Sequence, residues 1–389
     1  MSRAWRFVRD HYLVLPLGGA IAIVWSNAWP LEYFKASQAL AFAVNDVGMA
    51  FVLAYVAQEV VEAAMPGGTL HPWRRASVPV IAGIGGALAA IAVYLLYVGS
   101  TDEEMLVRGW PIACGVDIFF CAAIARAIFR RGSASTFLLL LALASDVVGL
   151  AATSRTFVVA DVHPAAGLLI VPAVVVAAML RRRNVRSVWP YLLSSAPLSW
   201  LACFWTGLHP ALALLPIVPF FVHSPRNLNV TGAARGEHRR ARHFEEVFEY
   251  PVQAVVFLFA LVNAGVLLRG FGTATWAVLT ALLAARPAGI LAAVALAVSV
   301  GLHLPRNVGW KDLIVIALTA SLSVTFGLFF AAAVFPDGPL LIETRIGALG
   351  TSVGVLIALA AARLLRVGRF ANVPLARQPI GARLTRGRA

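Results

Sequence analysis

Apolar runs of about 20 residues, the length of a helix that crosses a bilayer, follow one another along almost the whole chain. The chain has 389 residues, of which 60% are hydrophobic and only 13% are charged. A soluble protein of this length would need more polar surface, so the composition indicates an integral membrane protein. We mark twelve runs, at residues 12–29, 38–63, 76–98, 109–130, 134–157, 162–182, 187–204, 206–223, 250–269, 273–301, 311–335 and 341–366. The sequence therefore predicts an all-α membrane protein with twelve transmembrane helices.

The basic residues lie mainly in alternate gaps between these runs, which explains the net charge of +14 better than a nucleic-acid partner does. Counted over the gaps and the adjoining run ends, Lys and Arg are split 25 against 5 between the two sides. Because the richer side is normally cytoplasmic, we expect a multi-pass protein of the cell inner (plasma) membrane with both termini in the cytoplasm. Residues 367–389 are rich in arginine and are expected to form a basic cytoplasmic tail along anionic headgroups.

Residue types that enzymes use do not form a catalytic pattern in this sequence. Cys114, Cys121 and Cys203 lie inside apolar runs and have neither disulfide nor metal-ligand spacing. We find no nucleophile beside a base, no metal cluster and no phosphate-binding loop. The sequence therefore predicts a protein that is not an enzyme and that carries no cofactor.

The fourth run is interrupted near its centre by a carboxylate and by residues that weaken a helix. Pro111 and Gly115 loosen the helix, and Asp117 follows at about the depth of the membrane centre. A charge at this depth costs about 2.5–3.5 kcal/mol on insertion scales, so it is expected to face the interior of the bundle. Asp117 is therefore a candidate for an ion site, and an inert buried acid is the alternative.

Two further charges lie inside apolar runs, Asp146 in the fifth and Arg286 in the tenth. Arg286 stays protonated in essentially any protein setting, so a carboxylate or the C-terminus of a broken helix must face it. Asp146 or Asp117 is the natural counter-ion. Carboxylates and one permanent cation near broken helices are typical of an ion-transport site.

The eleventh run contains a small, polar segment, Thr319–Gly327, which includes Thr325. We expect a second broken helix here, although close helix packing through small residues would have the same composition. Interrupted helices in corresponding places, the fourth and the eleventh, indicate an inverted repeat with a site near the membrane midplane. Asn263 in the ninth run belongs either to helix packing, which we favour, or to the cavity.

The second run holds Asp46 near one end and Glu59 near the other, about 20 Å apart along a helix. We therefore interpret the two carboxylates separately. Asp46 is expected to cap the start of the helix at the outer surface. Glu59 either lines a cytoplasmic funnel that attracts cations or is a solvated helix end.

Short segments in all parts of the chain carry a family resemblance. They are Asn45–Ala50 with Glu59, Val78–Gly86, Gly109–Ile118, Thr206–His209, Leu258–Ala260 with Asn263–Val266, Arg286–Ile290 and His303–Pro305. Together, and in this order, they resemble the bacterial NhaA-type sodium/proton antiporter family over residues 10–366. The resemblance implies one antiporter domain of twelve helices, with the discontinuous fourth and eleventh helices crossing. It also implies exchange of sodium or lithium for protons by alternating access.

By this match, Asp117 takes the place of the acid in the fourth-helix break, and Arg286 takes a place where the family commonly has lysine. The family's threonine before that acid is Val116 here. In the fifth helix the family has two adjacent aspartates, where this chain has Ser145, Asp146 and Val147. Two alignments are open. Asp146 matches the first aspartate if a following glycine is aligned, and the ion-binding second one if the Ser-Asp pair itself is aligned.

We expect a monovalent cation/proton antiporter in which a proton and a cation compete for Asp146. Arg286 would compensate charge, and Asp117 would neutralise the helix ends at the crossing. The partners would be sodium or lithium ions, protons and the lipid bilayer, with a homodimer left open, and no metal beyond the transported cation. The alternatives are a sodium-coupled symporter on a related scaffold and a transport-inactive membrane sensor or scaffold of the same fold.

Overall fold

The computed structural model describes residues 14–66, 68–101, 103–129, 132–156, 162–185, 187–221, 250–267, 270–336 and 338–371. Every regular element in these ranges is a helix. The helices are α2 (Val14–Ala28), α3 (Pro30–Ala41), η1 (Phe42–Gly48), α4 (Met49–Ala64), α5 (Trp73–Gly99), η2 (Glu104–Cys114), α6 (Ile118–Phe129), α7 (Ser133–Thr156), η3 (Pro164–Leu169), α8 (Ile170–Arg182), α9 (Trp189–Trp205), η4 (Pro210–Leu212), η5 (Val218–Phe220), Tyr250–Asn263, α11 (Thr273–Leu279), η6 (Thr280–Ala285), α12 (Arg286–Ser299), α13 (Trp310–Thr319), α14 (Thr325–Val334), α15 (Pro339–Gly350), α16 (Val353–Leu364) and η7 (Gly368–Phe370). Most of the predicted basic tail, residues 367–389, lies outside the described residues, which end at Ala371.

Several of these helices have the length and composition of membrane spans. Six are long and apolar enough to cross a membrane, namely Pro30–Ala64, Trp73–Gly99, Ser133–Thr153, Pro164–Arg182, Thr273–Ser299 and Pro339–Phe370. The bent pair formed by η2 and α6 adds a seventh if it is counted as one span. The prediction of an all-helical, multi-pass membrane protein is thereby confirmed.

The second predicted run begins earlier than the sequence indicated. α3, η1 and α4 form one continuous helix, Pro30–Ala64, whose middle part, η1, is π-helical. Asp46 lies inside η1, so the prediction that it caps the start of a helix is wrong. Glu32 and Lys35 lower the hydropathy of the first turns. Both residue types favour the helical conformation, so they do not end the helix.

The eighth predicted run, residues 206–223, contains only short helical turns in its described part, which ends at Phe221. The turns include η4 and η5. The prolines at positions 210, 216 and 219 each remove a backbone donor, which prevents a continuous α-helix. Apolar composition was therefore a correct indication of burial but not of helix length.

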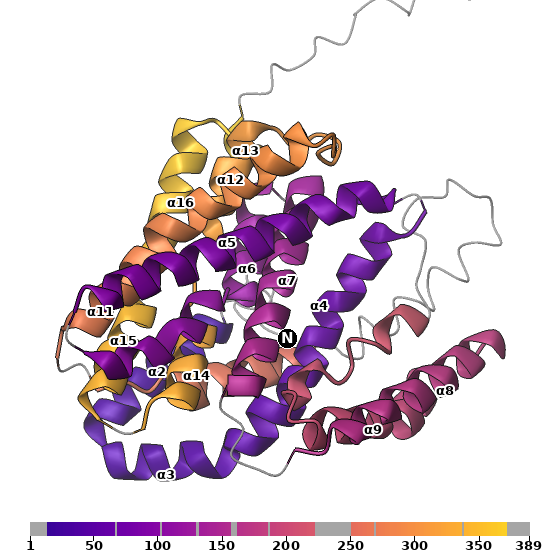
Figure 1. Cartoon of the computed structure of the whole chain (residues 1–389), viewed down its shortest axis with the longest axis horizontal. Coiled ribbons are helices and arrows are strands. Elements are labelled where there is room, and N and C mark those ends of the chain that lie inside the picture. The colour runs from indigo at the N-terminus through magenta and orange to yellow at the C-terminus, as the bar shows by residue number, and fades with distance from the viewer. Residues whose placement is uncertain are drawn as a thin grey trace, which may run out of the picture.

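The helices that hold the buried charges pack around α5. α5 lies along α12 and also packs on α7 and η2, and Figure 1 shows it running diagonally across the molecule beside α12. Gly289 permits this close approach, because a Cβ at that position would collide with Ala89 and with the Gly85 carbonyl. The tight α5–α12 contact places the start of α12, where Arg286 lies, in the interior of the bundle.

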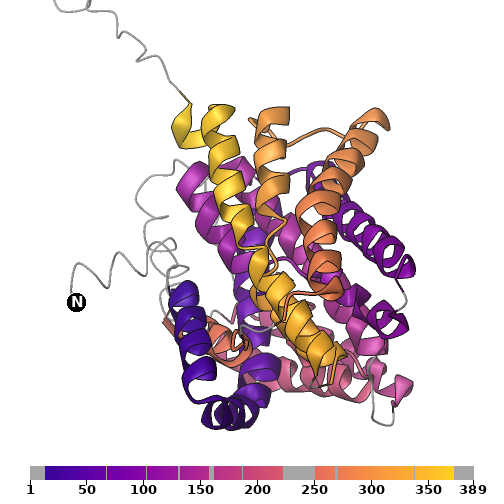
Figure 2. The ribbon, with the colours of Figure 1, turned by 90° about the vertical axis from the view of Figure 1, so that its left-hand side faces the viewer.

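Two helix pairs lie at opposite edges of the molecule (Figure 1). α8 packs on α9, and α4 contacts this side through η4 and η5. At the other edge α11 packs on α15. Figure 2 shows α15 and α16 following one another as a long rod along one face. Between these edges the adjoining ends of η2 and α6 and of α13 and α14 lie beside α7 and α12, and together they form the candidate site.

Candidate functional site

Asp117 lies at a helix break, in the short non-helical segment between η2 and α6. η2 ends at Cys114, the residues that follow are not helical, and the axis of α6 is bent from that of η2 by 42°. Asp117 Oδ1 accepts a hydrogen bond from the Phe120 N–H at 3.4 Å, so the carboxylate caps the first turn of α6. The Asp117 N–H donates to the Leu322 carbonyl at 2.8 Å, which joins this break to a second one.

The second break lies between α13, which ends at Thr319, and α14, which begins at Thr325. Asp117 Oδ2 accepts two hydrogen bonds here, from the Thr325 N–H at 2.8 Å and from the Thr325 hydroxyl at 2.6 Å. One fully buried carboxylate therefore meets the N-terminal ends of both α6 and α14. Because helix N-termini carry partial positive charge, Asp117 neutralises the two ends together.

Arg286 lies against the opposite ends of the two breaks. Its side chain is 1% exposed. The guanidinium donates to the carbonyl oxygens of Ala113 and Gly115, the latter at 2.7 Å, and a longer bond of 3.5 Å reaches the Ala320 carbonyl. These carbonyls lie at the C-terminal ends of η2 and α13, where helices carry partial negative charge. The permanent cation and the carboxylate thus stabilise opposite ends of the two breaks.

The hydrogen-bonding pattern of Arg286 differs from the predicted pairing with Asp146 or Asp117. Asp146 is near enough for the two charges to attract each other. Among the residues that the structure describes, however, the guanidinium donates only to backbone carbonyls. A broken helix presents several uncapped carbonyls at one point, and the five donors of a planar guanidinium can satisfy more than one of them. Arg286 therefore faces a broken helix end, the second partner that the sequence allowed.

Asp146 lies on α7 and points at the first break. The side chain is fully buried, and its Oδ1 accepts a hydrogen bond from the Val116 N–H at 2.8 Å. The preceding residue, Ser145, donates its hydroxyl proton to the Cys114 carbonyl at 3.0 Å. Two successive residues of α7 therefore hold the broken segment. Asp146 Oδ2 is buried and accepts no hydrogen bond from any residue in the described ranges.

Sequence reasoning missed how two residues take part in this site. Val116 was placed at the helix break as a residue that lacks a hydroxyl, and the structure uses its backbone N–H. Ser323 was one of several small polar residues, and its hydroxyl is buried without a hydrogen-bond partner in the described part of the chain. A Cβ built on Gly115 would lie 2.9 Å from that hydroxyl, so Ser323 borders the break. Neither contact has a local sequence signal, because each depends on how distant segments cross.

Asn263 lies outside this site. Its amide nitrogen donates to Asn45 Oδ1 at 2.8 Å, and the Asn45 amide donates back to Asn263 Oδ1 at 3.3 Å. A further bond of 2.8 Å joins it to the Phe259 carbonyl of its own helix. The paired amides connect the helix Tyr250–Asn263 with η1, which is a packing contact.

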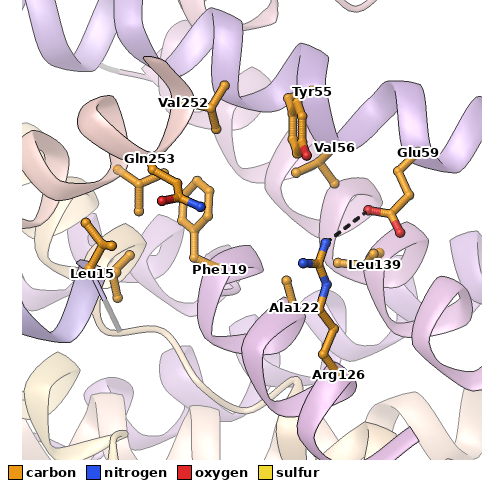
Figure 3. Close-up of a pocket in the computed structure, with 12 residues that line it drawn as sticks. Leu15, Tyr55, Val56, Glu59, Phe119, Ala122, Arg126, Leu139, Val252 and Gln253 are labelled. Atoms are coloured by element: carbon orange, nitrogen blue, oxygen red, sulfur yellow. Dashed lines mark ion pairs between the residues drawn. The ribbon is translucent and has the colours of Figure 1, made fainter. Parts of the chain in front are cut away.

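Glu59 lies at a separate place, on the wall of a cavity of about 30 Å³. Its Oε2 is 3.9 Å from Nη2 of Arg126 on α6. Figure 3 shows the two side chains pointing toward each other across the cavity from different helices. Sequence reasoning did not single out Arg126, because an arginine in the last turn of a helix is common without any special function.

Thr325→Val tests how much the side-chain bond contributes to Asp117. The variant loses the 2.6 Å hydroxyl bond but keeps the backbone bond to the same oxygen. We expect the free energy of unfolding to fall by about 1.5–3 kcal/mol, the range for hydrogen bonds to charged groups. Thermal unfolding in detergent measures the loss. Thr319→Val is the matched control, because its buried hydroxyl binds only the Val315 carbonyl of its own helix, and an equal loss there would contradict a special bond to Asp117.

Comparison with known proteins gives consistent matches over nearly the whole chain. The family described as Na+/H+ antiporter 1 matches residues 16–365. The Na(+)/H(+) antiporter NhaA of Geobacter metallireducens is 36% identical over 383 residues, which cover 95% of this chain and 100% of that protein. The NhaA of Desulfitobacterium hafniense is 35% identical over 373 residues, which cover 93% and 96%.

Solved structures give a likeness of fold. The structure of the sodium proton antiporter MjNhaP1 from Methanocaldococcus jannaschii at pH 8 matches with a TM-score of 0.58 and covers 92% of both chains. The sequence identity in this match is 15%, so it shows a common fold and nothing finer.

Proposed function

Because the chain belongs to the Na+/H+ antiporter 1 family, we propose that sodium and protons compete for Asp146 at the break between η2 and α6. Sodium/proton antiport follows from the family, since the family match covers residues 16–365. The similar antiporters named above also match this chain over nearly their whole lengths. The geometry of the two breaks supports Asp146 as the residue that carries the exchange.

The observation that carries the proposal is the second oxygen of Asp146. Oδ2 is buried and has no hydrogen-bond donor in the described residues, while Oδ1 is held by Val116. A buried charge without a partner is strongly unfavourable, so this carboxylate holds either a proton or a cation. Since it does not hold both, binding of one ligand releases the other. Alternating exposure of Asp146 to the two sides of the membrane then couples the two flows.

Asp117 and Arg286 support the exchange without carrying it. Asp117 accepts three hydrogen bonds, from Phe120 and Thr325, and these occupy both of its oxygens. Arg286 is bound to carbonyls of both breaks. Together they neutralise the four helix ends at the two breaks. The helices can therefore stay interrupted at membrane depth, and the interruption leaves room for a cation beside Asp146.

The function is tested by reconstituting the purified protein in liposomes with an acidic lumen. External sodium or lithium should make the lumen alkaline, followed with a trapped pH-sensitive dye, because each cation that enters releases a proton. Choline chloride at the same concentration is the control. The symporter and the transport-inactive alternatives both give no cation-dependent proton movement, and that result would overturn the proposal.

The exchange is expected to be electroneutral, with about one proton per monovalent cation. Ser145 or Val147, depending on the alignment, stands beside Asp146 where the family has a second acid, and arginine does not release its proton at cellular pH. Asp146 is then the single carrier. An electrogenic exchanger would gain about 2.3 kcal/mol per charge per 100 mV, whereas an electroneutral one gains nothing. A potassium-diffusion potential set with valinomycin should leave sodium-driven pH change unaltered, and acceleration or reversal by the potential would mean that Asp117 carries another proton.

We assign residues 10–366 to one antiporter domain with twelve membrane passes, in which the short turns of 206–221 make the eighth and the two broken helices are the fourth and eleventh. The excess of Lys and Arg on one side supports an inner-membrane protein with both termini and the tail 367–389 in the cytoplasm. On this orientation the end of α6 that carries Arg126 faces the cytoplasm. A homodimer remains open, and its test is the mass of the detergent-solubilised protein.

A further inference from the structure

A small cavity lies where α4, α6 and the helix Tyr250–Asn263 come together (Figure 3). Its volume of about 30 Å³ has room for a water molecule or a small ion. The wall is apolar except for a few side chains, among them Glu59, Arg126 and Gln253. A few polar groups in a mainly apolar wall suit a passage for a cation better than a binding pocket for an organic molecule.

The cavity lies on the way to the proposed exchange site. Phe119, which lines it, is two residues beyond Asp117 on α6. Arg126 lies two turns farther along the same helix, about 10 Å from Phe119 at 1.5 Å per residue. The wall therefore extends from the neighbourhood of the first break toward the end of α6.

An ion pair crosses the outer part of this cavity. Glu59 Oε2 and Arg126 Nη2 are 3.9 Å apart, and the side chains are 23% and 27% exposed. The partners come from α4 and α6, and each of these helices packs on α7. A long, partly hydrated ion pair contributes little to stability, so a passing cation can displace one partner from the other.

Deeper in the cavity, Gln253 presents an unsatisfied acceptor. The side chain is 7% exposed, and its Oε1 accepts no hydrogen bond from the described residues. Figure 3 shows Gln253 beside Phe119, on the opposite side of the cavity from the ion pair. An amide oxygen is a suitable ligand for a hard cation that has lost part of its water.

We propose that Glu59 and Arg126 form an ion-pair gate on the cytoplasmic side, and that a cation displaces Arg126 from Glu59 and is then received by Gln253. The inference rests on the proposed antiport function and adds the path by which the cation reaches Asp146. With the pair closed, the positive charge of Arg126 repels cations. When Glu59 turns to the cation, its carboxylate replaces lost water ligands, and Arg126 swings toward solvent.

The first test measures the apparent KM for sodium in everted membrane vesicles, where the cytoplasmic side faces outward. Arg126→Gln removes the positive charge beside the Glu59 carboxylate and should lower this KM, on the order of threefold to tenfold, the low end of what a charged cleft gives its counter-ion. Glu59→Gln removes the negative charge beside Arg126 and should raise the KM by a similar factor. The charge-exchanged variant, Glu59→Arg with Arg126→Glu, restores the pair and should return the KM toward that of the unaltered protein.

A matched control is Arg369→Gln, because Arg369 donates to the Ala127 carbonyl at the same end of α6 and does not line the cavity. It should leave the KM unchanged. A shift of the KM in the same direction in both Arg126→Gln and Glu59→Gln, or no shift in either, would overturn the gate. Absence of exchange in the unaltered protein would overturn the proposed function instead, so the two failures are distinguishable.

A second measurement needs no transport. Ala122 lines the cavity one turn inside Arg126, and Ala122→Cys places a thiol there. Labelling with a water-soluble maleimide is read by peptide mass spectrometry, which separates position 122 from the buried Cys114, Cys121 and Cys203. Adding Arg126→Gln should speed labelling at position 122 about threefold or more, in line with the gain expected for the KM. Equal rates with and without Arg126 would show that the pair does not close the cavity.

Discussion

Asp146→Asn is expected to abolish sodium- and lithium-driven proton movement while the protein still inserts and folds. Asparagine keeps the shape of the side chain, and its Oδ1 can still accept the hydrogen bond from the Val116 N–H. What it loses is the ionisable oxygen, which occupies the Oδ2 position. A neutral amide neither binds and releases a proton at cellular pH nor compensates the charge of a cation, so both halves of the exchange should stop.

The measurement is the rate of sodium-dependent alkalinisation in proteoliposomes, normalised to the amount of folded protein. Ser145→Ala is the matched control, since it removes a hydroxyl that binds the Cys114 carbonyl and leaves the carboxylate in place. That variant should retain exchange. Undiminished exchange in Asp146→Asn would remove Asp146 from the ion path and make Asp117 the remaining buried carboxylate of the two breaks.

Arg286→Met is expected to give the largest loss of stability of any single change at the site. Methionine fills much of the same space but donates no hydrogen bonds, so the carbonyls of Ala113 and Gly115 are left unsatisfied. Asp146 then also loses the attraction of a nearby cation. Removing one partner of a buried charged arrangement costs on the order of 3–5 kcal/mol. Thermal unfolding in detergent measures this loss.

Arg286→Lys separates charge from geometry. Lysine keeps the positive charge but carries it on one nitrogen, which cannot reproduce the planar fork that reaches two carbonyls. We expect a loss clearly smaller than that of Arg286→Met. An equal loss in both variants would mean that the carbonyl geometry, rather than the charge, accounts for the whole effect.

The double variant of Arg286→Met and Asp146→Asn measures the coupling between the two side chains. Because the guanidinium binds carbonyls, only attraction through space links it to Asp146. Asp146→Asn should therefore recover a small part of the loss, below the roughly 1.5 kcal/mol that marks the lower range for a hydrogen bond to a charged group. A coupling energy of about 3 kcal/mol, near the top of that range, would show a direct ion pair.

The sequence alone was sufficient for the class of protein and for the identity of the buried charges. Long apolar runs require helices in a membrane, and this requirement is local, because it depends only on the transfer of consecutive side chains into lipid. Asp117, Asp146 and Arg286 were recognisable for the same reason, since a charge within such a run is costly wherever the run packs. The family resemblance rested on short segments distributed over residues 10–366.

Apolar composition did not decide where helices end. Pro30–Ala64 continues through polar residues that lowered its hydropathy, and residues 206–221 are apolar without forming a long helix. In the first case intrahelical hydrogen bonds continue regardless of side-chain polarity, and in the second three prolines interrupt them. Hydropathy predicts whether a segment lies in an apolar environment, whereas the backbone hydrogen bonds determine its conformation.

Only the tertiary structure decided the partners. Asp117 binds Thr325, Arg286 binds the carbonyls of Ala113 and Gly115, and Asp146 binds the Val116 N–H. Each of these contacts joins two different elements of the chain, and backbone groups supply most of the partners. A backbone N–H or carbonyl is the same in every residue other than proline, so the sequence does not mark which ones are left unpaired. Which backbone groups are left unpaired depends on how the two broken helices lie against each other, and this is determined by the packing of the whole bundle.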